Sequence, residues 1–415
     1  MKLSQADDRS TRGAKRARLL EEAAKALNSR GISQTSLAEI AKSVGVSRAA
    51  LYYYFEDQED LVFQSYRRSC EMMARRLSEA SHAGGDAMSI LAAFVDGMLA
   101  EDEPEFASLS EPAYLRPEQH STILGLYEAL LASIAELLQA GARRGELRPC
   151  STGIVAQAII GLVSWIPMAR RWRSSQALSH GDMVEAIKVL LDRGVAVERR
   201  LPIEIQQFDF SFADVRLDRV FDAEALAAAK QQALLASASW LFNLKGVDAT
   251  SLEEIATRVG VTKKVIYHNV GDKETLVVEC YRRSFRMWEE IAQWGRRYPG
   301  SRLEAFCAAM AAGAEASLRE DLATLSPLAG FEALPASAQD EINASAVRLM
   351  DAHLEIFAVG QAQGSMSATN PRAILAVVPG VYQWLPKWFD TFTAEERQTA
   401  AREVSELVGL GLRPL

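Results

Sequence analysis

The sequence predicts an all-α fold built from two tandem copies of one helical unit. The segment Gly31–Ser69 recurs without a gap 215 residues later as Gly246–Ser284, and 19 of the 39 aligned positions are identical. Apolar residues recur at helical spacing through most of the chain, whereas strand-like alternation and hairpin signals are scarce. A chain of 415 residues also exceeds what one hydrophobic core usually serves. We therefore expect two domains of roughly 200 residues each.

The first predicted helix covers Thr11–Arg30 and ends at Gly31, which has the role of a C-cap. Basic side chains gather near its start: Arg12, Lys15, Arg16 and Arg18. Residues 1–50 contain ten Lys or Arg against five Asp or Glu, although the whole chain has a net charge of −8. DNA affinity requires a basic face rather than a basic average, so the acidic chain still has a candidate DNA-binding region.

Two short helices joined by a sharp turn are predicted next, in both copies. Ser36-Leu-Ala-Glu39 has the pattern of a capping box, and Ser251-Leu-Glu-Glu254 repeats it. Gly45 and Gly260 supply the positive φ that the turn requires. The following helices are expected to be capped by Ser47 and Thr262. The pattern predicts a helix-turn-helix, whose second helix enters the DNA major groove; a plain helical hairpin is the alternative.

The remaining helices also occur in matched pairs. Asp57 is expected to cap a helix that runs to His82, and Asp272 caps its counterpart. Further helices are predicted at 86–100, 118–144, 151–173 and 181–197, and again at 301–318, 337–363, 371–389 and 393–410. In this part of the chain the landmarks correspond at an offset of 219, as Gly161 does with Gly380 and Trp165 with Trp384.

These matches divide the chain into five parts. The expected bounds are 1–56 (first head), 57–197 (first bundle), 198–222 (connector), 223–271 (second head) and 272–415 (second bundle). The connector contains apolar residues that predict packing against the domains rather than a free linker: Phe208, Phe210, Phe212 and Val215.

The pattern T-S-L-x-E-I-A-x-x-V-G-V-S-x-x-x-L-Y-x-Y-F-x-D-x-E-x-L, which begins at Thr35 and continues into a long capped helix, resembles the tetracycline-repressor (TetR) family of bacterial one-component regulators. The resemblance covers about 11–75 and again about 226–290, while the other helices agree with the family only in number and length. It implies two tandem TetR-like subunits, each a three-helix head on a larger helical bundle for ligand binding and dimerisation. It also implies that the last two long helices of each half, within 151–197 and 371–410, associate mainly within one chain. A dimer of chains is the alternative.

The resemblance places the DNA contacts in each head. The start of the second helix would face the base edges, and Tyr52 and Tyr267 match the family's DNA-contacting tyrosine. Phosphates would be contacted two positions later and at the start of the next helix, where the family favours lysine and the first copy has Gln58. The positions implied are Ser36, Ser47, Arg48, Ala49, Ala50, Tyr52 and Tyr54 in the first copy, and Ser251, Thr262, Lys263, Lys264, Val265, Tyr267, Asn269 and Lys273 in the second. The second copy departs from the family at Val270, where the first has Phe55. A second motif kept only as a structural relic is therefore a further alternative.

The family also implies a small effector inside the bundle. We expect it to be apolar or aromatic, because Trp, Phe and Met surround proline-containing stretches such as Trp165-Ile-Pro167. The same side chains could instead be ordinary core. The candidate pocket residues are Phe94, Met98, Tyr114, Tyr127, Trp165, Met168, Phe306, Met310, Phe331, Tyr382 and Trp384.

Other functional classes find little support in the sequence. No Ser-His-Asp or Cys-His arrangement and no phosphate-binding glycine loop indicates an enzyme, and the four cysteines and five histidines are too scattered to suggest a metal or another cofactor. The uncharged run 149–169 is too interrupted by polar residues and proline to predict a membrane span. The expected protein is therefore a cytoplasmic regulator whose partners are a double-stranded DNA operator and an effector. A helical adaptor or enzyme without DNA binding is the alternative of another class.

Overall fold

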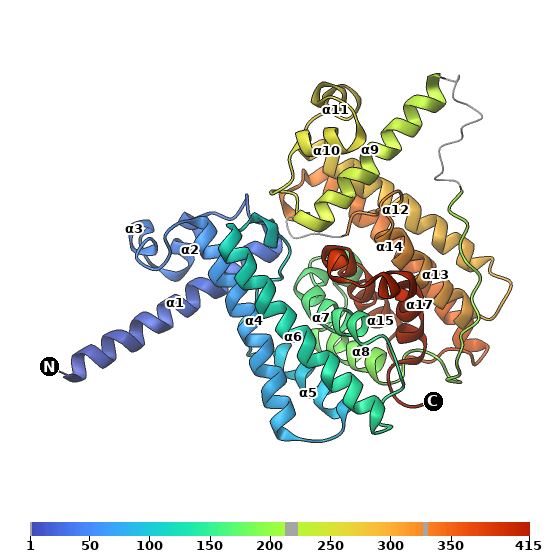
Figure 1. Ribbon diagram of the computed structural model, residues 1–415, viewed down its shortest axis with the longest axis horizontal. Helices are drawn as coiled ribbons and strands as arrows, with labels where there is room; N and C mark the ends of the chain where they lie inside the picture. The colour runs from blue at the N-terminus through green and yellow to red at the C-terminus, as the bar shows by residue number, and fades with distance from the viewer. Residues whose placement is uncertain (1, 212–222, 327–330) are drawn as a thin grey trace.

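The computed structural model describes residues 2–211, 223–326 and 331–415, and every regular element in these ranges is a helix (Figure 1). This confirms the all-α prediction. The first half contains α1 (Lys2–Arg30), α2 (Leu37–Val44), α3 (Arg48–Leu51), α4 (Gln58–Ala83), α5 (Ala87–Met98), α6 (Pro117–Arg143), α7 (Thr152–Ala169) and α8 (His180–Asp192). The second half contains α9 (Ala223–Lys245), α10 (Leu252–Val259), α11 (Lys263–Asn269), α12 (Lys273–Arg296), α13 (Arg302–Leu318), α14 (Ala336–Ala362), α15 (Pro371–Val377), α16 (Pro379–Tyr382) and α17 (Ala394–Leu410).

The turn in each head forms as the glycines predict. Gly45 and Gly260 adopt φ values of 74° and 72°, and each ends the first helix of its pair. The capping box is complete only in the second copy, where Ser251 and Glu254 bond reciprocally. In the first copy Glu39 instead forms an ion pair with Arg30 at 2.6 Å, so only half of the predicted box is present.

Each head is tied to its bundle by one buried asparagine. The Asn28 side chain donates to the Phe106 carbonyl at 2.8 Å and accepts from the Ser108 amide at 2.8 Å. Its counterpart Asn243 accepts from the Ser326 amide at 3.0 Å and also donates to a carbonyl of the same loop. A buried polar side chain with its hydrogen bonds satisfied is costly to displace. The first helix of each head is therefore held against the loop whose backbone the asparagine bonds.

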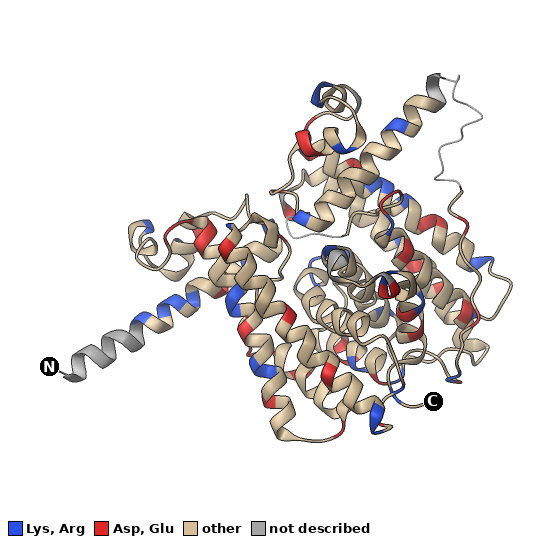
Figure 2. Ribbon diagram, viewed as in Figure 1, with Lys and Arg blue, Asp and Glu red and all other residues tan. Residues whose placement is uncertain are grey.

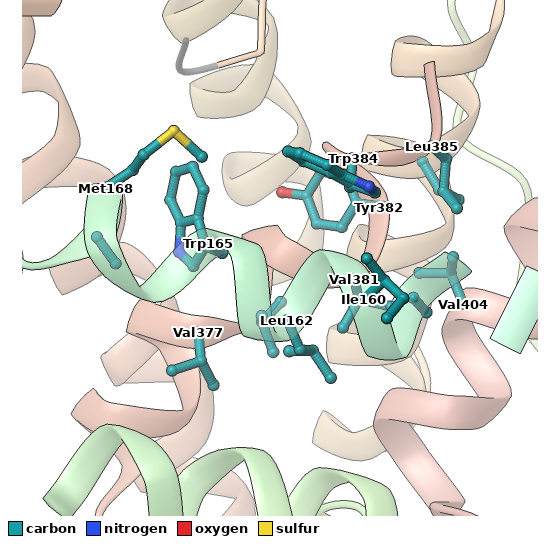
Figure 3. Close-up of a cluster of buried hydrophobic side chains, with 14 of the residues drawn as sticks. Ile160, Leu162, Trp165, Met168, Val377, Val381, Tyr382, Trp384, Leu385 and Val404 are labelled. Carbon is teal, nitrogen blue, oxygen red and sulfur yellow. The ribbon is translucent and has the colours of Figure 1, made fainter. Parts of the chain in front are cut away.

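The two halves pack on one another through their C-terminal helices. Helix α7 lies against α15, α16 and α17, while α8 lies against α15 and α17. Gly161 of α7 meets Gly380 of α16 so closely that a Cβ on Gly161 would lie 2.3 Å from the Gly380 carbonyl oxygen. Trp165 donates across this contact to the Ala376 carbonyl at 2.8 Å. Figure 3 shows the buried apolar side chains that both halves contribute to this cluster.

Several predicted boundaries differ from the structure. The helix predicted at 371–389 is broken into α15, α16 and a 3-10 segment at Leu385–Thr391, because Pro379 and Pro386 each remove a backbone donor. Its counterpart α7 holds its only proline, Pro167, within its last turn and is continuous to Ala169 rather than to Arg173. Helix α1 begins at Lys2, earlier than predicted.

The connector packs on the second half where it is described. Phe208 lies edge-to-face against Trp294 at 5.3 Å between ring centroids, and Phe210 is 6% exposed. Phe212 and Val215 lie outside the described residues.

Two helices, α6 and α7, are long and apolar enough in composition to cross a membrane. In α7 the most apolar window is 83% buried inside the molecule, as in the core helix of a helical bundle. In α6 the buried residues follow one face that packs on α4 and α7.

Candidate nucleic-acid interface and internal cavity

The second helix of each predicted helix-turn-helix lies at the outer end of its head, and both heads project away from the end of the molecule that holds the C-terminus (Figure 1). Tyr52 is 46% exposed and Tyr267 is 51% exposed, so neither tyrosine is used to fill the core of its head. At the start of α3 the Arg48 guanidinium lies 3.5 Å from the Tyr52 hydroxyl. At the start of α11 the Lys263 ammonium pairs with Glu253 at 2.5 Å. The same ammonium lies 5.8 Å from the centroid of the Tyr267 ring, so each edge holds a cation beside an exposed tyrosine.

A basic stripe on α1 extends the surface of the first head (Figure 2). The Arg12 guanidinium stacks over the Tyr53 ring, 4.1 Å from its centroid, and Tyr53 is 65% exposed. Sequence reasoning did not select Tyr53. The signal was available, because Tyr53 is the middle one of three consecutive tyrosines after Leu51, and a short helix cannot turn all three toward its core.

The other predicted DNA-contacting residues of the first head occupy several environments. Ala49 is exposed, whereas Tyr54 is half-buried against the head's core. Ser36 and Ser47 are N-caps whose hydroxyls accept backbone amides. Gln58, which aligns with Lys273 of the second copy, donates to the Ile32 carbonyl at 2.7 Å and so holds the turn between α1 and α2.

The second head differs from the first at the equivalent positions. Thr262 caps α11 without a side-chain hydrogen bond, while Lys264 and Val265 are exposed. Lys273 points its ammonium to the Asp248 carbonyl at 3.5 Å. The side chain of Asn269 lies outside the described residues.

The two heads contact each other through equivalent turns. The Ser33 amide donates to the Asp248 carboxylate at 2.7 Å, and these two residues are separated by the repeat distance of 215. The Asp248 amide donates in turn to the Glu111 carboxylate at 3.2 Å. Lys387 donates to the Asn243 carbonyl at 3.0 Å and to the Ser110 carbonyl. This network links the first head, the second head and both bundles.

The Glu111 carboxyl is buried in this network, with only 2% of the residue exposed. Burial, together with the negative charge of Asp248, raises the pKa of Glu111 to about 7, while Lys387 opposes the shift. Burial also lowers the pKa of the Lys387 ammonium to about 8. Both groups therefore change charge more readily near neutral pH than exposed groups of their kind.

The raised pKa of Glu111 has a consequence for stability. Because Glu111 binds its proton more tightly in the folded chain, the free energy of unfolding should fall as pH rises from about 4.5 to about 7. In the wild type, the part of this fall due to Glu111 should be on the order of 1–3 kcal/mol between about pH 5 and about pH 7.5. Urea unfolding at the two pH values should show that Glu111→Gln lacks it. Glu128→Gln changes an exposed carboxyl on α6 and should keep the wild-type pH dependence. An undiminished fall in Glu111→Gln would contradict the assignment.

A cavity of about 100 Å³ lies inside the second bundle, where the first half also contributes to the wall. Three predicted pocket residues line it, namely Trp165, Met310 and Tyr382. Tyr114 is partly buried against the core. The other candidates lie within the buried core: Phe94, Met98, Tyr127, Met168, Phe306, Phe331 and Trp384. Sequence reasoning missed further lining residues, including Trp172, Phe285, Trp288 and His353.

Comparisons with known proteins agree with the duplicated pattern. The family model for bacterial regulatory proteins of the tetR family matches residues 19–64 and again residues 234–280. The model for the tetracyclin repressor-like C-terminal domain matches residues 88–172. The HTH-type transcriptional regulator AcrR of Shigella flexneri is 35% identical over 77 residues, which is 18% of this chain and 36% of AcrR. The match thus spans about a third of that relative's length.

A longer alignment links the chain to the HTH-type transcriptional regulator TtgR of Pseudomonas putida, which is 24% identical over 174 residues, 38% of this chain and 79% of TtgR. Among solved structures, AibR in complex with isovaleryl coenzyme A and operator DNA is 20% identical. That match covers 42% of this chain and 97% of AibR, with a TM-score of 0.36.

Proposed function

The chain belongs to the tetR family of bacterial regulatory proteins, and from this premise we propose that it is a ligand-responsive DNA-binding regulator that acts as a single-chain pseudo-dimer. The observation that carries the proposal is the presence of two exposed helix-turn-helix edges in one polypeptide. DNA readers of this type act as symmetric pairs, and here the pair is covalently linked. Repression is the expected mode, after the repressor for which the family is named, and the expected location is the cytoplasm.

The contact between the halves supports the pseudo-dimer. Helices α7 and α8 meet α15, α16 and α17 in a central layer, and the ion pair between Arg413 and Asp192 at 2.8 Å joins the end of the chain to the first half. Arg148, buried beside this layer, donates to the Gly411 carbonyl at 2.6 Å. Because these surfaces are already covered within one chain, a second chain has no comparable surface to occupy there. We propose that the five parts of the chain, from the first head (1–56) to the second bundle (272–415), form the units of this arrangement.

The two edges carry different residues, so we propose an asymmetric operator. Ser47-Arg-Ala-Ala50 would face one half-site and Thr262-Lys-Lys-Val265 the other. Arginine and lysine pair with guanine O6 and N7, and alanine contacts the thymine methyl group. Tyr52 and Tyr267 would contact the DNA, while Tyr54, Asn269 and Lys273 would contact phosphates.

Selection from a random duplex pool tests this function. We expect the bound DNA to contain two unlike half-sites, with centres about one helical turn apart, on the order of 34 Å. Affinity for the selected site should fall steeply with salt concentration, because phosphate contacts release counterions. A perfect palindrome would instead indicate a dimer of chains that uses only the first heads, and recovery of no DNA would reject the function.

A further inference from the structure

The two bundles differ at three equivalent interior positions. Helices α6 and α14 both contain 27 residues, and they begin at Pro117 and Ala336, an offset of 219. Helices α7 and α15 begin at Thr152 and Pro371, the same offset. At this offset three large residues align with three alanines. Tyr127 and Gln157 of the first half align with Ala346 and Ala376, and Trp388 of the second half aligns with Ala169 of the first.

The three large residues fill the interior of the first bundle. The Tyr127 ring stacks on Trp388 with centroids 4.0 Å apart and an interplanar angle of 17°. The Tyr127 hydroxyl donates to the Gln157 side-chain oxygen Oε1 at 2.7 Å and accepts from the Trp384 indole at 3.0 Å. Tyr127 is 1% exposed. Its hydrogen bonds and its stacking partner are therefore all supplied by the protein, and two of these partners come from the other half.

The three alanines line the cavity of the second bundle. Ala346, Ala376 and Ala169 all stand in its wall, together with Trp165, the counterpart of Trp384. Small side chains therefore leave open in the second bundle the space that Tyr127, Gln157 and Trp388 occupy in the first. Figure 3 shows Trp165 and Trp384 in the same buried layer between the halves.

The wall of this cavity has a defined chemistry. None of the described residues that line it is Asp, Glu, Lys or Arg, and five are aromatic: Trp165, Trp172, Phe285, Trp288 and Tyr382. Among the described atoms the Trp288 indole nitrogen and the Gln383 side-chain oxygen are buried without a hydrogen-bond partner. An unpartnered buried donor and an unpartnered buried acceptor are costly unless water or a ligand satisfies them, so both are available to a ligand's hydroxyl group.

His353 adds a second acceptor to the wall. Its Nδ1 lies 2.9 Å from the Leu349 carbonyl, so Nδ1 must carry the proton and Nε2 is left as an acceptor. Burial lowers the pKa of His353, which keeps the ring neutral near pH 7. A carboxylate ligand would find no opposite charge here, whereas a hydroxyl could accept from Trp288 and donate to Gln383.

We propose that each chain binds one effector, in the second bundle only, and that this effector is an uncharged single-ring aromatic molecule with a hydroxyl group. The cavity of about 100 Å³ limits the effector to one ring, since an apolar protein cavity of roughly 150 Å³ holds a single benzene. This inference rests on the proposed regulatory function for its biological meaning, but the binding itself is measured without DNA. Failure of DNA selection and failure of ligand binding are thus separate results.

Titration of the full chain with 4-fluorophenol, followed by fluorine NMR, tests the proposal. We expect saturable binding of one molecule per chain, with 4-fluorobenzoate and fluorobenzene binding at least about tenfold more weakly, because one is charged and the other lacks the hydroxyl. Binding of two molecules per chain, equal binding of 4-fluorobenzoate, or no saturable binding of 4-fluorophenol would each overturn it.

A pair of variants on one helix locates the site. Ala346→Tyr restores the side chain found at the equivalent position of the first bundle and should weaken 4-fluorophenol binding at least about tenfold. Ala344→Tyr, at an exposed position of α14, should bind like the wild type. If Ala346→Tyr loses its helical circular dichroism, Ala376→Gln supplies a second filling variant with the same expected loss. Wild-type affinity in a folded filling variant would place the ligand elsewhere and contradict the proposal.

Discussion

Replacing Gly161 by alanine is expected to lower the free energy of unfolding by about 2–3 kcal/mol. The new Cβ would lie 2.3 Å from the Gly380 carbonyl oxygen and 2.8 Å from the Trp384 Cβ, and both atoms belong to packed parts of the other half. Neither a backbone carbonyl nor a Cβ can move aside as the end of a flexible side chain can. The two halves would therefore have to separate by a fraction of an ångström, and urea unfolding should detect the loss.

Gly125→Ala is the matched control for this prediction. Gly125 also lies within a helix, α6, but no atom stands within 4 Å of the position its Cβ would take. Alanine has the higher helix propensity, so this variant should be more stable than the wild type by up to about 1 kcal/mol. The opposite signs of the two changes separate the packing effect from helix propensity. Equal stabilisation by both alanines would show that the halves do not meet closely at Gly161.

Arg48→Ala is expected to relax base preference in one half-site of the operator and to cost about 1–3 kcal/mol of binding free energy there. Lys263→Ala should do the same in the other half-site, because the two residues begin the outer helices of different heads. The Lys263 effect includes the release of its ion pair with Glu253, in which both side chains are well exposed. Such exposed pairs contribute little, so they compete weakly with a base contact.

Each of these variants is the control for the other. Affinity is measured on the selected operator and on two operators in which one half-site at a time is randomised. Randomising the half-site that Arg48 reads should cost Arg48→Ala less affinity than it costs the wild type, and randomising the other half-site should do the same for Lys263→Ala. Tyr54→Ala should instead weaken binding to all sequences alike, since phosphate contacts carry no base information. A loss in the same half-site from both Arg48→Ala and Lys263→Ala would reject the assignment of one head to each half-site.

Local signals in the sequence were sufficient for the helices of the heads. Asp57 and Asp272 cap α4 and α12, and Gly45 and Gly260 end α2 and α10, because caps and positive-φ turns depend on residues within one helical turn. The break in the penultimate helix of the second half was harder to predict. Two prolines make it possible, but whether a helix bends or breaks depends on what packs beside it.

The candidate site shows the same limit. Exposure of Tyr52 and Tyr267 follows from a pattern that the sequence repeats, whereas the bond from Ser33 to Asp248 joins residues 215 positions apart. The difference between Tyr127 and Ala346 is visible in an alignment of the halves, yet only the fold shows that one fills a bundle and the other lines a cavity. Long-range packing, rather than local propensity, decides these features.

The mass of the complex on its selected operator tests the single-chain pseudo-dimer most directly. Light scattering at low protein concentration would give the number of 45.6 kDa chains that each duplex holds. We predict one chain per duplex, with both heads engaged, and a free protein of the same single-chain mass. Two chains per duplex, with a free protein of twice 45.6 kDa, would contradict the account.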